Sequence, residues 1–405
     1  MSEKPVRLAY FVSHPIQYQA PLLRRIAADP SIELTVFFAS DISLREHFDA
    51  GFNRRIAWDV DLLGGYQHEF LPAIGDRSRL SLFRPFNYGV VQRLIRGRFD
   101  AVWCHSYVRL PHLTALIAGR LLGKKVFLRD EASVISSNST GLRRLIKVFF
   151  HQTMRLVLNG ILTIGTRNRE YYASIGFRQD QLFWMPYAVD NDWFAERIAD
   201  AAKKREAFRE ELGLEPGRPI ILFASKLQPR KRAQDLIRAF QKIVDDPAAG
   251  RPYLLIAGDG ELRDELETLA ADAPANSIHF LGFRTQAELP PLYDVCDVFV
   301  LPSNTEPWGL VTNEAMNAGR AIIATTEVGS ARDLVRDGEN GFIIEPGDID
   351  ALADHLLTLC SDRHLCSRMG HKSLEIIENW DFTADIAGLH EALRVHFGDR
   401  IPKTK

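Results

Sequence analysis

The sequence has few cysteines and no long apolar run, and each shortage excludes a class of protein. Only four cysteines occur in 405 residues, Cys104, Cys296, Cys360 and Cys366, and they form neither a CxxC pair nor the spacing of a metal site. We therefore expect buried or free thiols in a reducing compartment. No stretch approaches the roughly 20 apolar residues that span a bilayer, and the apolar run after Pro5 is too short for a signal peptide. The sequence therefore predicts a cytoplasmic protein.

The length and composition indicate a globular protein of two domains. A chain of 405 residues is long for one hydrophobic core, and 46% hydrophobic with 25% charged residues is ordinary for such proteins. The net charge of −2 conceals an asymmetry, because residues 1–195 hold 25 basic and 17 acidic side chains whereas residues 196–405 hold 25 and 35. A basic first half fits an anionic acceptor or an anionic membrane surface, although charge also drifts along chains without consequence.

Short apolar runs recur along the chain and alternate with helical stretches. In the first half we expect strands at residues 7–12, 32–39, 99–104, 125–128, 161–164 and 183–189. In the second half we expect strands at residues 219–224, 253–257, 278–281, 298–301, 321–324 and 341–344. This alternation predicts two parallel, doubly wound sheets. Residues 41–80 are predicted to be irregular, and the polar stretch 190–218 is the candidate linker.

The stretch from Leu301 to Arg320 has the pattern of a strand end, a loop and a short helix. In α/β proteins this arrangement turns backbone N–H groups and a helix N-terminus toward a phosphate. Two carboxylates frame the turn, Glu306 in the loop and Glu314 in the helix. Acidic pairs at this spacing are common by chance, and a glutamate near a helix N-terminus also interacts favourably with the helix dipole. The pair gains meaning only from the residues around it.

The wider pattern PSxxEPxGLVxxEAMxxGxxIIAT, which begins at Pro302, resembles the donor-binding signature of the retaining family 4 glycosyltransferases (glycosyltransferase group 1). The resemblance implies the GT-B fold, an α/β fold in which two Rossmann-like, doubly wound parallel-sheet domains face a central cleft. It covers roughly residues 160–350 well and the N-terminal half only in layout. It implies an acceptor domain at residues 1–195 with a C-terminal crossover helix at 381–405, and a nucleotide-sugar donor domain at 196–380.

The same resemblance implies which residues bind the donor. Lys226 and Lys231 stand where the family has an Arg and a Lys that hold the diphosphate, and two cations there would stabilise the charge that grows as the glycosidic bond breaks. Glu306 matches the glutamate beside the donor sugar, and Glu314 the one that binds the ribose hydroxyls. The other donor-binding candidates are Trp308, Gly309, Leu310, Val311, Gly258, Asp259 and Phe283. Without the resemblance, the basic residues would be read as a solvated turn and Phe283 equally well as core.

Acceptor binding is predicted in the N-terminal half, where the loop SHPIQYQAP replaces the family's glycine-rich first loop. The candidates for binding acceptor hydroxyls are His14, Gln17, Tyr18 and Gln19 of this loop, and His105. His105 ends a predicted strand at the correct edge of the sheet, although a lone histidine is more often structural. Asp130, with Glu131 as second choice, is the candidate for activating or orienting the acceptor hydroxyl. An ion pair of Arg129 with either acid is an equally good alternative.

The sequence gives little support for a metal or a nucleic acid. Three Asp-x-Asp matches, at residues 59–61, 190–192 and 348–350, do not end a predicted strand, so we expect no metal and no other cofactor. Aromatic side chains do not interleave with the basic runs, which disfavours nucleic-acid binding. The basic amphipathic stretch 141–158 could lie on an anionic membrane, but packing on its own domain explains the pattern better.

These expectations combine into one function with two alternatives. The resemblance implies a retaining glycosyltransferase that moves a hexosyl unit from a UDP- or GDP-sugar to an acceptor hydroxyl, with the leaving phosphate taking the acceptor proton. A surface polysaccharide or lipid-linked glycan is the expected acceptor, and a cytoplasmic location with peripheral contact at the inner membrane face would suit it. The alternatives are another GT-B enzyme, such as a phosphorylase or a nucleotide-sugar epimerase, and a non-catalytic nucleotide-sugar-binding protein.

Overall fold

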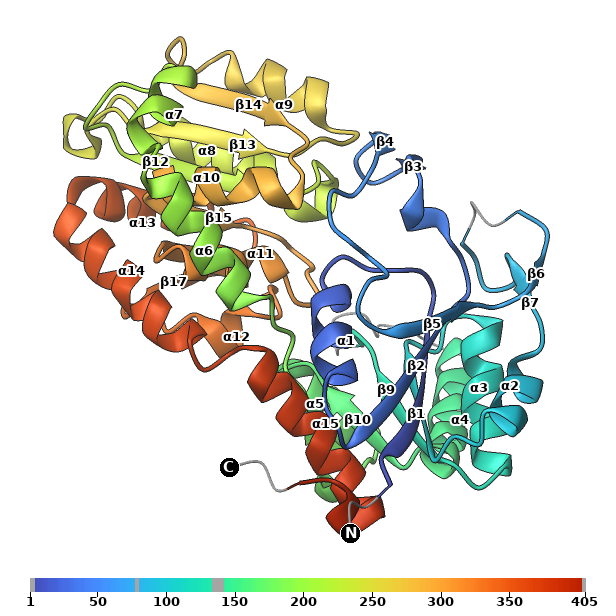
Figure 1. The fold of residues 1–405 in the computed structure, drawn as a ribbon. Helices are drawn as coiled ribbons and strands as arrows, with labels where there is room; N and C mark the ends of the chain where they lie inside the picture. Colours follow the sequence, from blue (N-terminus) through green and yellow to red (C-terminus); the bar gives the residue numbers. More distant parts are fainter. Residues whose placement is uncertain (1–3, 77–79, 133–141, 403–405) are drawn as a thin grey trace. The chain divides into compact units, whose positions relative to one another are not determined.

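The computed structural model describes residues 4–76, 80–132 and 142–402, and for residues 142–149 the backbone alone. These residues form two compact units (Figure 1). The N-terminal unit comprises the described residues of Met1–His47, Val60–Tyr187 and Phe382–Lys405. The C-terminal unit comprises Phe48–Asp59 and Ala188–Asp381. Each unit is built on its own parallel sheet.

The main sheet of the N-terminal unit has seven strands in the order β11-β10-β9-β8-β1-β2-β5. All neighbouring pairs are parallel. The strands are β1 (Val6–Val12), β2 (Ile32–Phe38), β5 (Gln67–Phe70), β8 (Ala101–His105), β9 (Lys125–Arg129), β10 (Gly160–Thr163) and β11 (Leu182–Trp184). The central strands are almost wholly buried, because helices cover a parallel sheet on both faces.

In the described part of this unit, the helices beside the sheet are α1 (Gln19–Ala27), α2 (Val90–Arg96), α3 (Leu110–Leu121), α4 (Leu142–Val157), α5 (Thr166–Ser174) and α15 (Phe382–Phe397). The last of them packs against β10, β11 and α1. Gly388 makes this approach possible, because a Cβ atom there would lie 1.8 Å from the carbonyl oxygen of Trp184. The end of the chain therefore belongs to the unit that holds its beginning.

The main sheet of the C-terminal unit has six parallel strands in the order β14-β13-β12-β15-β16-β17. The strands are β12 (Ile220–Ala224), β13 (Tyr253–Ala257), β14 (Ile278–Gly282), β15 (Val298–Leu301), β16 (Ala321–Thr325) and β17 (Gly341–Ile344). The order runs one way from β12 to β14 and the other way from β15 to β17. The sheet therefore has its topological switch point between β12 and β15, which is where open α/β sheets bind ligands at the strands' carboxyl ends.

Helices flank this second sheet, and α8 and α13 pack on each other over its core. The helices are α6 (Asn191–Ala202), α7 (Arg205–Glu211), α8 (Ala233–Ile243), α9 (Arg263–Ala270), α10 (Leu289–Val295), α11 (Leu310–Asn317), α12 (Ala331–Leu334), α13 (Ile349–Ser361) and α14 (Arg363–Ile377). In α8, Leu236, Ile237 and Phe240 are fully buried. Their spacing of three and four residues gives the helix one apolar face.

Most predicted strands agree with the observed ones to within two residues, but three expectations were wrong. The run 183–189 is a strand only to Trp184, because Pro186 has no N–H group for a strand ladder. The edge strand β5 was missed because its sequence, QHEF, is polar. Residues 41–80 are not wholly irregular, since β5 and three short strands lie there: β3 (His47–Asp49), β4 (Arg54–Ile56) and β6 (Ala73–Ile74), which pairs with β7 (Phe86–Asn87).

The boundaries of the two units differ from a simple division of the chain into halves at two segments. The predicted linker 190–218 contains α6 and α7, and α6 spans the expected boundary between residues 195 and 196. Phe48–Asp59 belongs to the C-terminal unit, although the chain on either side of it belongs to the N-terminal unit. We call Phe48–Asp59 the crossing segment. Its contacts bear directly on the candidate site.

Candidate active site

Two loops of the C-terminal unit meet at the carboxyl ends of the neighbouring strands β12 and β15. After β12 the chain makes a short 3-10 turn at Pro229–Lys231, and after β15 it enters the loop that holds Glu306. The amide of Asn304 donates to the carbonyl of Arg230 over 2.9 Å and joins the loops. The Lys231 ammonium donates to Oε2 of Glu306, and Nη1 of Arg230 lies 3.2 Å from the same oxygen. The structure thus brings Lys231 and Glu306 together.

The contact between Lys231 and Glu306 is largely shielded from water. The exposed fraction is 7% for the Lys231 side chain and 11% for that of Glu306. Burial lowers the pKa of Lys231, and the adjacent Glu306 carboxylate counteracts part of that effect. Charge interactions are strong in such surroundings because little water screens them. The pair therefore holds a cation in a fixed place where an anionic ligand would bind strongly.

Lys226, the other predicted phosphate ligand, is paired with the crossing segment. Its Nζ donates to both carboxylate oxygens of Asp49, at 2.9 and 3.0 Å, and lies 4.5 Å from the centre of the Phe52 ring. Burial alone would raise the pKa of Asp49, but the hydrogen bonds and charge of Lys226 outweigh it and hold that pKa below its usual value. Lys226 is thus placed beside the site with an acidic partner that the sequence did not reveal.

The Gly258-Asp259-Gly260 turn packs tightly against the loop that follows β12. A Cβ atom on Gly258 would lie 1.9 Å from the carbonyl oxygen of Ser225, and one on Gly260 would lie 2.5 Å from that of Leu227. Both glycines have positive φ angles, 151° and 156°. Only glycine allows this approach of two backbones. The turn therefore shapes the loop that carries Lys226 and Lys231.

The crossing segment also covers Phe283 and Asp259. Phe52 packs edge-on against Phe283 with ring centres 4.7 Å apart, and the Arg54 guanidinium lies 5.5 Å from the Phe283 ring centre. Arg54 also pairs with Asp259 at 3.4 Å. Three predicted donor-binding positions, Lys226, Asp259 and Phe283, therefore share this one short segment as a neighbour.

The loop before α11 is fixed by backbone contacts to residues 327–330. The Glu306 amide donates to the carbonyl of Glu327 over 3.1 Å, and the Gly329 amide donates to the carbonyl of Glu306 over 2.9 Å. Gly309 has a φ angle of 90°, which glycine adopts without strain. The ring of Trp308 is buried, donates to Asn313 and stacks on Trp380, so its side chain is core. Ligand binding by the amides of Trp308, Gly309, Leu310 and Val311 stays a prediction.

Glu314 lies in α11 and is fully buried. The Tyr293 hydroxyl donates to its Oε2 over 2.7 Å, while its Oε1 is buried without a hydrogen-bond partner. Burial raises the pKa of Glu314 to about 7. Because the Glu314 carboxylate is fully enclosed, a ribose would reach it only after a neighbouring group moved. The predicted ribose contact therefore remains a prediction that requires such a movement.

In the N-terminal unit, the topological switch point lies between β1 and β8, and polar side chains gather around His105, the last residue of β8. Nε2 of Gln19 lies 3.1 Å from the His105 ring, and the Tyr187 hydroxyl lies 3.2 Å from its Nε2. The Tyr187 hydroxyl is also 3.2 Å from Glu131, and the Tyr10 hydroxyl donates to Gln19. Gln19 was predicted among the first-loop candidates, but Tyr187, which follows β11, was missed. Burial, with Arg129 adding to it, lowers the pKa of His105 to about 3, so this imidazole is neutral at physiological pH.

The Asp130 carboxylate is buried, although its predicted role requires contact with the acceptor. It is 6% exposed, and it accepts a hydrogen bond from the Ala132 amide at 3.2 Å. Burial raises its pKa, although hydrogen bonds from Tyr172 and Ala132 counteract this. The alternative ion pair of Arg129 with Asp130 or Glu131 was wrong: Arg129 donates instead to Asp385 of α15 at 2.9 Å. The sequence could not show this pair because its partners are 256 residues apart.

The predicted acceptor residues of the first loop lie after β1 in the same unit. His14 Nδ1 is 2.8 Å from the Ser13 hydroxyl, and burial lowers the pKa of His14 to about 4, with Arg109 adding to the effect. Gln17 is 8% exposed and its Oε1 has no hydrogen-bond partner, while Tyr18 is partly exposed. These side chains offer neutral hydrogen-bonding groups, as a sugar acceptor requires, but their role stays a prediction.

Two of the three Asp-x-Asp matches have a structural explanation. Asp190 and Asp348 cap α6 and α13 by accepting from backbone amides of the first helical turn. In the described part of the chain, no group of three or more His, Cys, Asp or Glu side chains is arranged to hold a metal ion. The absence of a metal in the reaction nevertheless stays a prediction. All four cysteines are buried free thiols, as expected.

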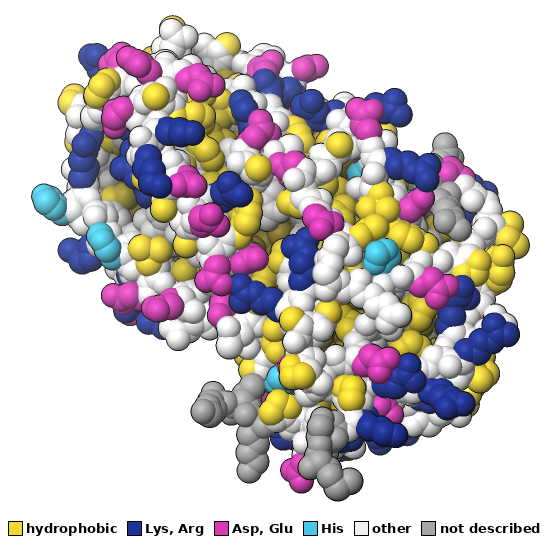
Figure 2. Space-filling view, in the orientation of Figure 1, with side chains coloured by type: hydrophobic (Ala, Val, Ile, Leu, Met, Phe, Trp, Pro, Cys, Tyr) yellow, Lys and Arg dark blue, Asp and Glu magenta, His cyan; other side chains and the backbone are white. Residues whose placement is uncertain are grey.

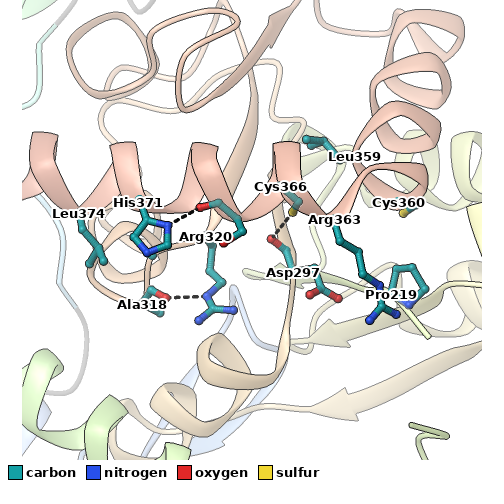
Figure 3. A pocket seen from close by; sticks show the side chains of 12 residues that line it. Pro219, Asp297, Ala318, Arg320, Leu359, Cys360, Arg363, Cys366, His371 and Leu374 are labelled. Atoms are coloured by element: carbon teal, nitrogen blue, oxygen red, sulfur yellow. Dashed lines mark hydrogen bonds between the residues drawn. The ribbon is translucent and has the colours of Figure 1, made fainter. Parts of the chain in front are cut away.

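A separate cavity of about 310 Å³ opens at the opposite edge of the C-terminal sheet (Figure 3). It lies beside Pro219, Asp297 and Arg320, which directly precede β12, β15 and β16. Its polar groups bond mainly to the protein itself, since Arg320 donates to Ala318 and Cys366 to Asp297 (Figure 3). Ligands of open α/β sheets bind at the other edge, so we do not place the active site here.

Within residues 4–76, 80–132 and 142–402, no helix combines the length and the apolar character needed to cross a bilayer. The basic amphipathic stretch 141–158, for which we preferred packing on its own domain to membrane contact, forms α4 over most of its length. The side chains that carried this prediction, at residues 142–149, lie outside the described ones.

Comparison with known proteins identifies the family. A family model described as glycosyl transferases group 1 matches residues 204–375. The N-acetyl-alpha-D-glucosaminyl L-malate synthase of Bacillus anthracis is 32% identical over 285 residues, which cover 67% of this chain and 69% of that protein. This chain belongs to the group 1 glycosyltransferases. It is thus a member of a family of transferase enzymes, and the family 4 resemblance read from the sequence is confirmed.

Two further comparisons fit this group 1 glycosyltransferase. A GDP-mannose-dependent alpha-(1-6)-phosphatidylinositol monomannoside mannosyltransferase of Mycobacterium tuberculosis is 30% identical over 243 residues, 57% of this chain and 60% of that protein. The crystal structure of Anabaena HepE in complex with UDP has a TM-score of 0.70 at 17% identity and covers 96% of this chain and 100% of HepE. With the two parallel sheets, this likeness confirms the GT-B fold. The chain spans about half the length of the first curated relatives that it matches.

Proposed function

We propose that this protein is a retaining glycosyltransferase that moves a hexosyl unit from a UDP- or GDP-sugar to an acceptor hydroxyl. The observation that carries the proposal is the shielded contact of Lys231 and Glu306 at the switch point of the C-terminal sheet. Family membership supplies the reaction class. The proposal includes uracil and guanine as the nucleotide base, because HepE was crystallised with UDP whereas the mycobacterial relative is named as GDP-mannose-dependent.

Stabilisation of the leaving diphosphate by positively charged side chains is the main catalytic contribution that we assign to the chain. Lys231, Arg230 and Lys226 lie around the carboxyl end of β12 and would bind the phosphate oxygens. As the bond between the anomeric carbon and the phosphate oxygen breaks, these cations stabilise the charge that collects on the phosphate. The acceptor oxygen bonds to the anomeric carbon on the same face, and its proton passes to the departing phosphate.

Glu306 would act on the sugar rather than on the phosphate. Its carboxylate holds Lys231 and Arg230 in place before the donor binds. With the donor bound, the same carboxylate would hydrogen-bond the sugar hydroxyls and stabilise positive charge at the anomeric carbon. We assign Glu314 to the ribose, and its buried position then requires that Tyr293 or the loop before α11 moves when the donor enters.

For the acceptor, we assign the orienting carboxylate to Glu131 in preference to Asp130. Glu131 is exposed and bonded to Tyr187, whereas Asp130 is buried and already accepts hydrogen bonds. His105, Gln17 and the first-loop residues would then bind acceptor hydroxyls. A glycan or a lipid-linked glycan of a surface polysaccharide is the acceptor class that we propose, because the N-terminal half is rich in basic residues.

The proposal is tested by measuring transfer with a donor chosen by thermal stabilisation. A ligand at a hundred times its Kd stabilises a protein by about 2.7 kcal/mol, so a panel of UDP- and GDP-sugars should reveal the donor. With that donor, Lys231→Ala and Glu306→Gln should each lower kcat by roughly a hundredfold or more. Lys242→Ala is the matched control, because Lys242 forms a half-exposed surface pair with Asp350.

Several results would overturn this function. Near-normal transfer by both variants would remove the catalytic role of the site. Conversion of the donor without any acceptor would indicate an epimerase, and a pyridoxal phosphate absorbance band would indicate a phosphorylase. Donor binding without turnover across an acceptor panel would support a non-catalytic binding protein. A product with the opposite anomeric configuration to the donor, determined by NMR, would exclude the retaining mechanism.

A further inference from the structure

One part of the N-terminal unit exposes an unusual concentration of large hydrophobic side chains. Ten of the sixteen large hydrophobic side chains that the described structure leaves exposed lie within residues 80–125. Three of the most exposed are Phe83 at 60%, Ile95 at 57% and Leu121 at 81%. Single exposed apolar residues are normal, but a gathering of them marks an interaction surface. We call residues 82–96 together with 108–122 the apolar face.

The elements of the apolar face are contiguous in space. The Leu110 amide at the start of α3 donates to the carbonyl of Leu82 over 3.1 Å, so the loop before β7 lies against that helix. Helix α3 also packs against both α2 and β7. Figure 2 shows hydrophobic side chains along the right edge, where Figure 1 draws β6 and β7, with basic side chains beside them. The elements that carry the exposed apolar residues therefore adjoin one another.

Helical spacing shows that this exposure follows a pattern. Val91 and Ile95 are four residues apart on α2 and share a side of that helix, and Tyr88 is exposed just before the helix begins. Ile117 and Leu121 are four residues apart on α3 and also share a side. Each helix also buries another side in the core, where Leu94 and Leu116 are fully buried. Each helix therefore exposes apolar side chains in addition to those that it buries.

The charges within this stretch are almost all positive. Residues 80–125 contain eight Lys and Arg side chains and one acidic side chain, Asp100. That carboxylate is already bonded to Arg400 at 2.7 Å. Arg84, Arg96 and Arg120 are exposed and lie within the apolar face. A partner for this surface therefore needs both an apolar layer and negative charge.

We propose that the apolar face docks the protein on the surface of an anionic lipid bilayer. Aromatic and aliphatic side chains would enter the boundary between headgroups and acyl chains, while the arginines contact lipid phosphates. A second copy of the chain fits less well, because two such faces would bring like charges together. The inference concerns binding alone and does not depend on the donor or the reaction. It agrees with a lipid-linked acceptor, which would be presented at the same surface.

Vesicle co-sedimentation of the whole chain tests the proposal without any nucleotide sugar. The probes are vesicles of phosphatidylcholine alone and of phosphatidylcholine with phosphatidylglycerol. We expect binding to the anionic vesicles that weakens as salt rises. The triple variant Phe83→Ser, Ile95→Ser, Leu121→Ser should reduce partitioning by about tenfold or more. The variant Arg96→Glu, Arg120→Glu should remove the preference for anionic vesicles. Circular dichroism confirms that each variant is folded.

A matched control carries the same kinds of change elsewhere on the chain. Leu374, Val395 and Arg238 are exposed outside the apolar face, so Leu374→Ser, Val395→Ser, Arg238→Glu should bind vesicles as the unchanged protein does. The proposal is overturned if the unchanged protein binds neither kind of vesicle, or if the triple variant binds as well as the control. Light scattering could instead show that the unchanged protein is a dimer. If the triple variant is monomeric and vesicles do not affect the dimer, the apolar face serves self-association, and the membrane proposal is overturned.

Discussion

At the scale of single residues, the candidate site depends on charges that are placed before any ligand arrives. Lys231 and Glu306 are held against each other in a shielded position, and Arg230 adds a second cation on the same carboxylate. Each charge needs the others, because an unpaired charge in such surroundings is costly. A diphosphate could replace the carboxylate as partner of the cations, which would free Glu306 for the sugar. The arrangement is therefore suited to a ligand that carries both an anion and hydroxyl groups.

Glu314 provides a pH-dependent test at this scale. Burial raises its pKa to about 7 in the folded protein, so the folded state holds the proton more tightly than the unfolded state. The resulting contribution to stability is present below the unfolded pKa and is lost as the pH rises through about 7. Glu314→Gln cannot ionise, so it should gain stability relative to the unchanged protein, by up to about 3 kcal/mol, between pH 5 and pH 8. Urea unfolding at both pH values measures this, and an equal difference at both would contradict it.

At the scale of elements, the order of the strands explains where the polar residues gather. Both sheets reverse direction once, between β12 and β15 and between β1 and β8. Loops leaving neighbouring strands at such a point run apart and leave room for a ligand. Lys231 and Glu306 follow the first pair of strands. In the second pair, Gln19 follows β1 and His105 is the last residue of β8. The order of the strands therefore explains why these residues, which are distant in the sequence, lie near one another.

The crossing segment gives a prediction about donor affinity. Asp49 holds the ammonium group of Lys226 through two hydrogen bonds, so a diphosphate must compete with that carboxylate. Asp49→Asn removes the negative charge, and we expect the nucleoside diphosphate to bind about three- to tenfold more tightly. Calorimetric titration measures the change. Asp41→Asn, which removes a carboxylate paired with the exposed Arg45, is the control. Weaker binding by Asp49→Asn would show instead that Asp49 orients Lys226.

At the scale of the whole molecule, the two ends of the chain are fastened to the same unit. Arg129 at the end of β9 donates to Asp385 of α15, and both side chains are at most 2% exposed. Arg400 donates to Asp100 and to the carbonyl of Pro5. The C-terminal helix thus stabilises the N-terminal sheet through buried charge as well as apolar packing. Its removal would uncover that sheet.

The buried pair of Arg129 and Asp385 predicts a large effect on stability. Asp385→Ala leaves the Arg129 charge buried without its partner, which should cost about 3–5 kcal/mol. The double variant Arg129→Met, Asp385→Leu should recover much of that loss, because it removes both charges. Urea unfolding followed by circular dichroism tests both statements. Asp180→Ala, in an exposed pair with Arg178, should leave the unfolding midpoint unchanged. An equally small effect of Asp385→Ala would contradict the role of the pair.

Local sequence determined much of this protein, because its strands are short apolar runs and its turns carry glycine and proline. Eleven of the twelve predicted strands end within two residues of the observed strands, and the second half was predicted throughout. The same stretches place Lys231 and Glu306 after strands, so their importance could be inferred from residue type and position. The polar edge strand β5 and the short strands β3 and β4 could not be predicted, because they lack that apolar pattern.

Tertiary structure alone decided which distant residues became partners. Lys226 is bonded to Asp49, Arg129 to Asp385, and Glu314 is enclosed with one oxygen bonded to Tyr293. The number of residues between two positions does not predict such pairs, because chain folding brings them together through the packing of whole elements. Burial likewise depends on all the neighbours of a side chain. Packing therefore determined both the raised pKa of Glu314 and the exposure of the apolar face. The sequence thus determined the kinds of element and the family, whereas packing determined the surroundings in which each charge acts.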